Sequence, residues 1–110
     1  MNIKHKELAS GRWHQLSFLE QMANIGSGVN RALNWRKKDN PEYCQKALIR
    51  ALKLLALTLE KPSLPSHYKE LTRLKEAIID YFYGRNEFSS TEMSWCSYFD
   101  HFNYAARKNY

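Results

Sequence analysis

The sequence predicts an all-α protein, arranged as an antiparallel up-down-up-down four-helix bundle. Apolar residues recur at three- and four-residue steps in four segments, and short polar or proline-containing connections separate these segments. No stretch shows the alternation of apolar and polar residues that is typical of a half-buried strand. Because 110 residues suffice for one hydrophobic core, we expect residues 1–110 to form a single domain.

The first helix is predicted over residues 11–38, after a lead-in over residues 1–10 that we expect to be mobile. Its apolar stripe comprises Phe18, Met22, Ile25, Val29, Ala32 and Leu33. Gly26 and Gly28 interrupt the helical pattern, and each costs about 1 kcal/mol relative to alanine in a helix interior. They indicate either the close approach of another helix or a break that exposes backbone N–H groups to phosphate. We favour close packing, because no glycine-rich phosphate-binding motif is present.

The second helix, over residues 40–60, has the clearest signals. Asn40 suits the N-cap and Pro41 the first helical position, and the helix should end before Lys61-Pro62. One side carries the apolar residues Cys44, Ala47, Leu48, Ala51, Leu52, Leu55 and Leu59, and the other carries Lys46, Arg50 and Lys53.

Two further helices complete the predicted bundle. The third begins with Ser66 as a possible cap and ends at Gly84, with Leu71, Leu74, Ile78, Tyr81 and Phe82 facing inward. The fourth opens with a capping box formed by Ser89 and Glu92, and its inward face comprises Trp95, Cys96, Phe99, Phe102, Asn103 and Ala106. We expect the last residues, 108–110, to fray.

A formal net charge of +6 favours a polyanionic partner such as RNA or DNA. Lys46, Arg50 and Lys53 recur at steps of four and three, and Lys69 and Arg73 form a pair on the next helix. If the two helices are neighbours, these five cations are candidate contacts to a phosphate backbone. Exposed Tyr83 and Tyr104 would offer stacking surfaces for unpaired bases. The alternative is that both helices have cationic outer faces that serve only solubility.

The sequence contains no arrangement that is typical of a catalytic or metal site. His14, His67 and His101 fall in different elements, without a carboxylate at a metal-binding offset. Glu76 and Asp80, four residues apart, are either half of a cation site or a solvated face, and we favour the latter. We therefore expect no catalytic residue, no metal and no cofactor, although a hydrolase or nuclease stays a third alternative.

The apolar content of the second helix exceeds what one bundle interior needs. Ile49, Leu54 and Leu57 lie outside its core stripe, and Trp13 and Trp35 lie on the far side of the first helix. Such residues favour a homo-oligomer or a protein partner such as a nucleic-acid enzyme. An adaptor that docks a partner through this surface is the second functional hypothesis.

No apolar run is long enough to span a bilayer, and no apolar signal segment begins the chain. We therefore expect a cytoplasmic protein without a membrane partner. In that compartment Cys44 and Cys96 should be free thiols rather than a disulfide.

The segment from Met22 to Leu59 combines small residues in its first helix, a polar turn at 37–40 and a second helix rich in alanine and leucine. In this pattern it resembles small basic four-helix-bundle proteins, which include the accessory variability protein of diversity-generating retroelements and the proteins encoded in ribosomal RNA intervening sequences. The resemblance implies a barrel-like oligomer that binds nucleic acid and assists a reverse transcriptase.

Overall fold

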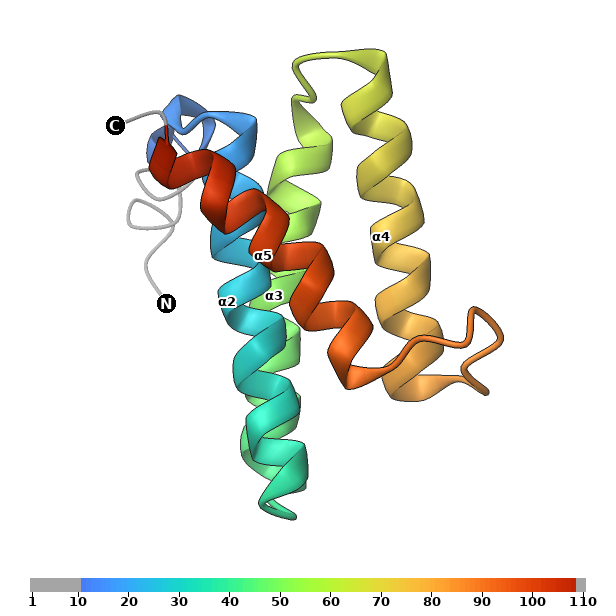
Figure 1. Ribbon diagram of the computed structural model, residues 1–110. Coiled ribbons are helices and arrows are strands. Elements are labelled where there is room, and N and C mark those ends of the chain that lie inside the picture. Colours follow the sequence, from blue (N-terminus) through green and yellow to red (C-terminus); the bar gives the residue numbers. More distant parts are fainter. Residues whose placement is uncertain (1–10, 109–110) are drawn as a thin grey trace.

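The computed structural model describes residues 11–108, which form an all-helical structure (Figure 1). This confirms the predicted all-α class. The four long helices are α2 (Phe18–Lys37), α3 (Pro41–Glu60), α4 (Pro65–Tyr83) and α5 (Glu92–Lys108). The expected mobile lead-in at 1–10 and the last two residues of the expected frayed end, 109–110, lie outside the described residues.

The first long helix begins later than predicted. Residues 11–15 are helical, but the chain turns at Leu16 and Ser17 before α2 begins at Phe18. Ser17 and Glu20 form a capping box, in which each backbone N–H donates to the other side chain at 3.1 Å. This exchange satisfies backbone donors that a helix start leaves open, so it favours a new helix start at this point. The prediction of one helix from residue 11 is therefore wrong at its start.

Gly26 and Gly28 lie inside an unbroken α2. A Cβ atom at Gly26 would lie 2.5 Å from the Phe99 ring of α5, and one at Gly28 would lie 3.0 Å from the Ala51 Cβ of α3. Each glycine therefore admits the close approach of a different helix. The close-packing interpretation is confirmed.

The helix α3 begins as predicted. Asn40 caps it by accepting a hydrogen bond from the Tyr43 N–H at 3.1 Å, and Pro41 occupies the first position. Its buried residues are Leu48, Ala51, Leu55 and Thr58.

Trp13 belongs to the core, which corrects its predicted place on an outer side. Its side chain is only 6% exposed, and its Nε1–H donates to Thr58 Oγ1 at 2.8 Å. The Thr58 hydroxyl in turn donates to the Leu54 carbonyl at 2.8 Å. The two buried polar groups are thus satisfied, which allows a tryptophan and a threonine to pack inside.

The starts of α4 and α5 differ from prediction. Leu64 is the N-cap residue of α4 and Pro65 its first residue, so Ser66 is not the cap. In α5 the exchange of hydrogen bonds runs between Thr91 and Ser94, at 2.8 and 3.0 Å. Ser89 instead has a φ of 54° within the preceding turn, so the predicted capping box of Ser89 and Glu92 is wrong. Gly84 ends α4 as predicted.

The helices pack around one hydrophobic cluster. The helices α2 and α3 form an antiparallel hairpin, α5 packs against α2, and α4 packs against α3. Figure 1 shows that α5 runs obliquely across the hairpin rather than antiparallel beside α4. The specific up-down-up-down topology is therefore not confirmed. Gly26 explains where α5 crosses, because the missing side chain makes room for Phe99.

Candidate nucleic-acid interface

The three cations predicted on the second helix lie on the outer side of α3. Lys46, Arg50 and Lys53 are all exposed, whereas the buried residues of this helix lie on its other side. Lys46 Nζ lies 3.5 Å from the Glu42 carboxylate one turn earlier, and both side chains are mostly exposed. An exposed pair of this kind contributes at most about 1 kcal/mol, so a phosphate can readily replace it. Arg50 and Lys53 make no ion pair with any residue between 11 and 108.

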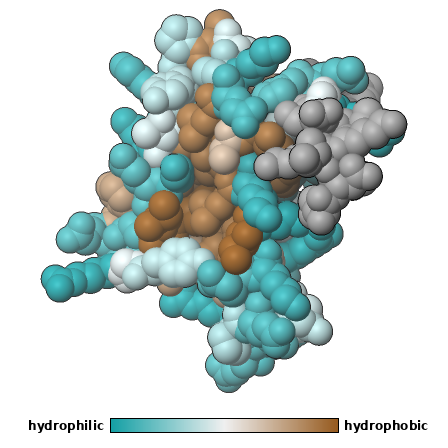
Figure 2. All heavy atoms as spheres, turned by 180° about the vertical axis from the view of Figure 1, so that it is seen from behind, coloured by the Kyte–Doolittle hydropathy of each residue, from teal (hydrophilic) through white to brown (hydrophobic). Residues whose placement is uncertain are grey.

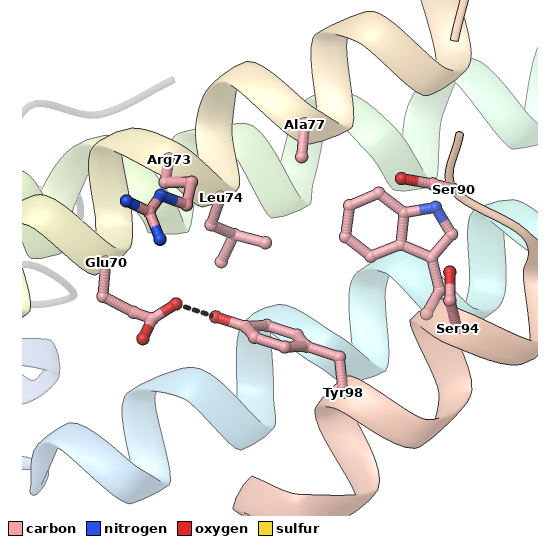
Figure 3. A pocket seen from close by; sticks show the side chains of 8 residues that line it. Glu70, Arg73, Leu74, Ala77, Ser90, Ser94 and Tyr98 are labelled. Atoms are coloured by element: carbon pink, nitrogen blue, oxygen red, sulfur yellow. Dashed lines mark hydrogen bonds between the residues drawn. The ribbon is translucent and has the colours of Figure 1, made fainter. Parts of the chain in front are cut away.

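Lys69 and Arg73 are exposed on α4, the neighbour of α3. Arg73 borders a cavity between α4 and α5 together with Glu70 (Figure 3). The five predicted cations are therefore exposed on two neighbouring helices.

Aromatic rings accompany the cations of α4. A hollow of about 590 Å³ is lined by Lys69 and Arg73 together with Tyr68 and Phe88. Tyr68 is 52% exposed and Phe88 is 57% exposed. Neither ring was predicted, since Phe88 lies in the loop after α4 and only folding brings it to the hollow beside Tyr68.

The two tyrosines predicted as stacking surfaces are exposed, Tyr83 to 52% and Tyr104 to 69%. Tyr104 lines a different hollow, on α5, together with Arg107 and Lys108. Neither tyrosine lines the hollow on α4.

A cavity of about 240 Å³ lies between α4 and α5, with Leu74 and Ala77 among its apolar lining (Figure 3). At one end the Tyr98 hydroxyl donates to Glu70 Oε2 at 2.6 Å. Burial raises the pKa of Tyr98, and the hydrogen bond and the negative charge of Glu70 raise it further. The phenol therefore stays protonated at neutral pH and holds the carboxylate in place.

Trp95 lines the same cavity and is only 5% exposed. Its ring packs against Phe99 and Tyr81, with centroids 6.1 and 5.9 Å away. Its buried Nε1 has no hydrogen-bond partner among the described residues. Leaving such a donor unsatisfied costs about 1–3 kcal/mol. The sequence places Trp95 inward, but no local pattern reveals that its N–H lacks a partner.

The carboxylates Glu76 and Asp80 do not act as a pair. Asp80 accepts hydrogen bonds from the backbone N–H groups of Glu87 and Phe88, at 2.7 and 3.0 Å. It therefore stabilises the loop that follows α4. Over residues 11–108, no three side chains of histidine, cysteine, aspartate or glutamate are grouped to hold a metal ion.

The three described histidines lie in different elements, as predicted. His14 lies 3.8 Å from the Glu60 carboxylate, His67 stacks on Phe18 with 3.7 Å between ring centroids, and His101 packs edge-on against Phe102.

Both cysteines are free thiols, as predicted. Partial burial raises the pKa of Cys44, so its thiol is less reactive than an ordinary exposed one. The thiol of Cys96 faces the Asn30 side chain at 4.0 Å.

A hydrophobic area occupies the middle of the face seen in Figure 2, with hydrophilic residues around it. Among the residues of α3 predicted to form an apolar surplus, Ile49 is 41% exposed, whereas Leu54 and Leu57 are partly buried against the core. The neighbouring helix α4 exposes Ile79 to the same extent. Trp35 is half-buried and packs edge-on against Tyr43. The apolar surplus is therefore smaller than predicted.

Within the described part of the chain, no helix has both the length and the apolar character needed to cross a bilayer. Comparisons of the chain with protein-family models, with curated proteins and with solved structures found no match. They neither support nor contradict the resemblance to the small basic bundle proteins.

Proposed function

We propose that this protein is a non-catalytic nucleic-acid-binding protein whose exposed cations contact a phosphate backbone. The observation that carries the proposal is the pair of cationic surfaces on α3 and α4, together with the two exposed rings beside Lys69 and Arg73. Cations interleaved with aromatic side chains are typical of surfaces that bind single strands, because the cations follow the phosphates and bases stack on the rings.

The cations of α3 supply the second argument. Arg50 and Lys53 have no carboxylate partner within residues 11–108, so a phosphate need not displace one. Contacts of this type set affinity without reading sequence. The resemblance to accessory proteins adds a more specific proposal, that the protein acts beside a reverse transcriptase.

The test is a triple charge reversal on α3, Lys46→Glu with Arg50→Glu and Lys53→Glu. The probe is a fluorescein-labelled single-stranded RNA of about 12 nucleotides, and anisotropy gives the affinity at several salt concentrations. If three phosphate contacts are lost, the slope of log K against log salt should become shallower by about 2, because each contact to a single strand contributes about 0.7.

The matched control reverses Arg12, Arg31 and Arg107, which are exposed on other parts of the molecule. Both triple variants bring the net charge from +6 to zero, because each reversal removes two positive units. The control variant should keep more of the affinity and the slope than the α3 variant does. Equal losses in both variants would show that only net charge matters, and unchanged binding in the α3 variant would reject its role.

The second candidate function is docking of a protein partner. It is favoured by the hydrophobic area in Figure 2 and by the exposed Ile49 and Ile79. This function would be established instead if the protein does not bind RNA or DNA at low salt and binds one partner protein stoichiometrically.

A further inference from the structure

We propose that Tyr43 and Trp35 form a stacking site for an unpaired base of a single strand whose phosphates contact the cations of α3. The inference rests on the proposed nucleic-acid binding and names the class of strand that the α3 surface binds. It follows from the position of the two rings, from their exposure and from the cations beside them.

The two aromatic residues meet beside the turn that joins α2 to α3, at the lower end of the hairpin in Figure 1. Trp35 lies in the last turn of α2 and Tyr43 in the first turn of α3. Their ring centroids are 4.9 Å apart, and the ring planes are inclined by 74°. Tyr43 is 44% exposed and Trp35 is half-buried, so both residues keep surface that a ligand can contact.

Tyr43 lies at the start of the cation row on α3. It precedes Lys46 by three residues, and the steps from there to Arg50 and to Lys53 are four and three. Side chains at such steps share one face of a helix, and all four are exposed. The row is about 15 Å long, at a rise of about 1.5 Å per residue. This length exceeds the rise of about 3.4 Å between successive nucleotides of one strand in a duplex, so the phosphates of one strand can contact more than one of the cations.

A lysine accompanies each ring of the pair. Lys38 Nζ lies 5.1 Å from the centroid of the Trp35 ring, and Lys46 Nζ lies 5.3 Å from that of the Tyr43 ring. Both lysines are exposed, and stacking of a base on an aromatic ring is typically stronger than an exposed cation–π contact. A base can therefore replace an ammonium group on a ring, which leaves that group close to the phosphate of the same nucleotide.

The rings distinguish a single strand from a duplex. Cations alone bind the phosphates of either form. In a duplex, neighbouring base pairs cover the faces of each base, whereas an unpaired base can present a face to an aromatic side chain. The combination of the ring pair with the cation row thus favours a strand that has at least one unpaired base.

The first test compares Tyr43→Leu, which removes the ring, with Tyr43→Phe, which keeps it. Anisotropy gives the affinity for the fluorescein-labelled RNA, for an abasic strand of equal length and for a blunt duplex of the same sequence. We expect Tyr43→Leu to bind the RNA about tenfold more weakly, because the stacking of one base is lost, and to bind the abasic strand and the duplex as the wild type does. Tyr43→Phe should keep most of the affinity for the RNA.

The matched control is Tyr104→Leu, which removes a 69% exposed ring from α5. It should weaken RNA binding less than Tyr43→Leu does. Circular dichroism confirms that each variant is folded.

The second test uses the fluorescence of the ring pair. Trp13 and Trp95 are only 6% and 5% exposed, so Trp35 is the one of the three tryptophans on which a bound base can stack. Because a stacked base quenches tryptophan emission, unlabelled RNA should quench the emission of the wild-type protein. It should not quench that of Trp35→Phe, which keeps a ring at this position. The abasic strand and the duplex should quench neither protein.

The outcomes separate this inference from the proposed function. If RNA binds, but Tyr43→Leu binds it as tightly as the wild type and the emission does not change, the stacking site is rejected and phosphate binding stands. Equal weakening for the RNA and for the abasic strand would also reject the site, because the effect would not depend on bases. Equal quenching by the duplex and by the RNA would reject the need for an unpaired base. If neither the RNA nor the abasic strand binds the wild-type protein, both proposals fail.

Discussion

At the scale of single residues, one missing side chain decides how α5 packs. Gly26 faces Phe99 so closely that a Cβ atom would lie 2.5 Å from the ring and 2.8 Å from the Phe99 Cβ. Rotation of the ring cannot relieve the second contact, because that Cβ is bonded directly to the backbone of α5. The glycine that lowers helix propensity is therefore required by the tertiary structure.

Gly26→Ala should destabilise the protein by about 1–2 kcal/mol. The substitution gains about 1 kcal/mol of helix propensity, but overpacking a core contact costs typically 1–3 kcal/mol, and this contact is at the severe end of that range. Urea unfolding followed by circular dichroism measures the change. Ser27→Ala, at the exposed neighbouring position, is the control and should be neutral or slightly stabilising. A Gly26→Ala protein as stable as the wild type would show that α5 does not cross α2 as closely as described.

Other single residues show where sequence patterns mislead. Trp13 was expected on an outer side, yet it is buried because Thr58 accepts its N–H. The two residues are far apart in sequence, so no local periodicity can show that they pair. The free thiols of Cys44 and Cys96, in contrast, were predicted without any knowledge of which residues pair in the fold.

At the scale of elements, only some helix starts and ends are determined by residues of the helix itself. Asn40 and Pro41 begin α3 as predicted, and Gly84 ends α4 as predicted. Each of these signals depends only on the residues of its own helix. Ser89 and Glu92 match a capping box in spacing, but Asn86 and Asp80 organise the preceding loop so that Ser89 adopts a positive φ. The helix start therefore moves to Thr91 and Ser94.

Asp80→Asn should destabilise the protein by about 1–2 kcal/mol, because the Asp80 carboxylate accepts two backbone hydrogen bonds in the α4–α5 loop and charged acceptors are the stronger ones. Chemical unfolding in buffer that contains EDTA measures the loss without any divalent cation. Glu76→Gln, one turn earlier and exposed, should change stability by less than about 0.5 kcal/mol. If both substitutions are neutral in EDTA and destabilising only in magnesium or calcium, the pair binds a cation and the loop explanation is wrong.

At the scale of the whole molecule, the protein surface has both a hydrophobic area and exposed cations. Figure 2 shows the apolar area with hydrophilic residues around it, and both α3 and α4 expose an isoleucine of the same fractional exposure. Contiguous apolar surface of this kind favours association with another protein surface, and a second copy of the chain is the simplest partner.

We expect the purified protein to have a solution mass above the 13.0 kDa of one chain. Ile49→Lys combined with Ile79→Lys should shift the mass toward the monomer, because two charges cannot be buried in an apolar contact without a large cost. Light scattering after size-exclusion chromatography measures the mass across a range of concentrations. Met93→Lys, on the exposed side of α5, is the control and should leave the mass unchanged. A wild-type monomer at every concentration would contradict self-association.

Helical periodicity was enough to predict the four long helices, most of their core residues and the exposure of the five cations. These properties depend on helical periodicity and on polar residues that stay in water, which are local features. The burial of Trp13 and the cavity that Glu70, Trp95 and Tyr98 line depend instead on tertiary packing. Each of these facts depends on how one helix is rotated and crossed relative to another, and close contacts such as that of Gly26 with Phe99 set that geometry.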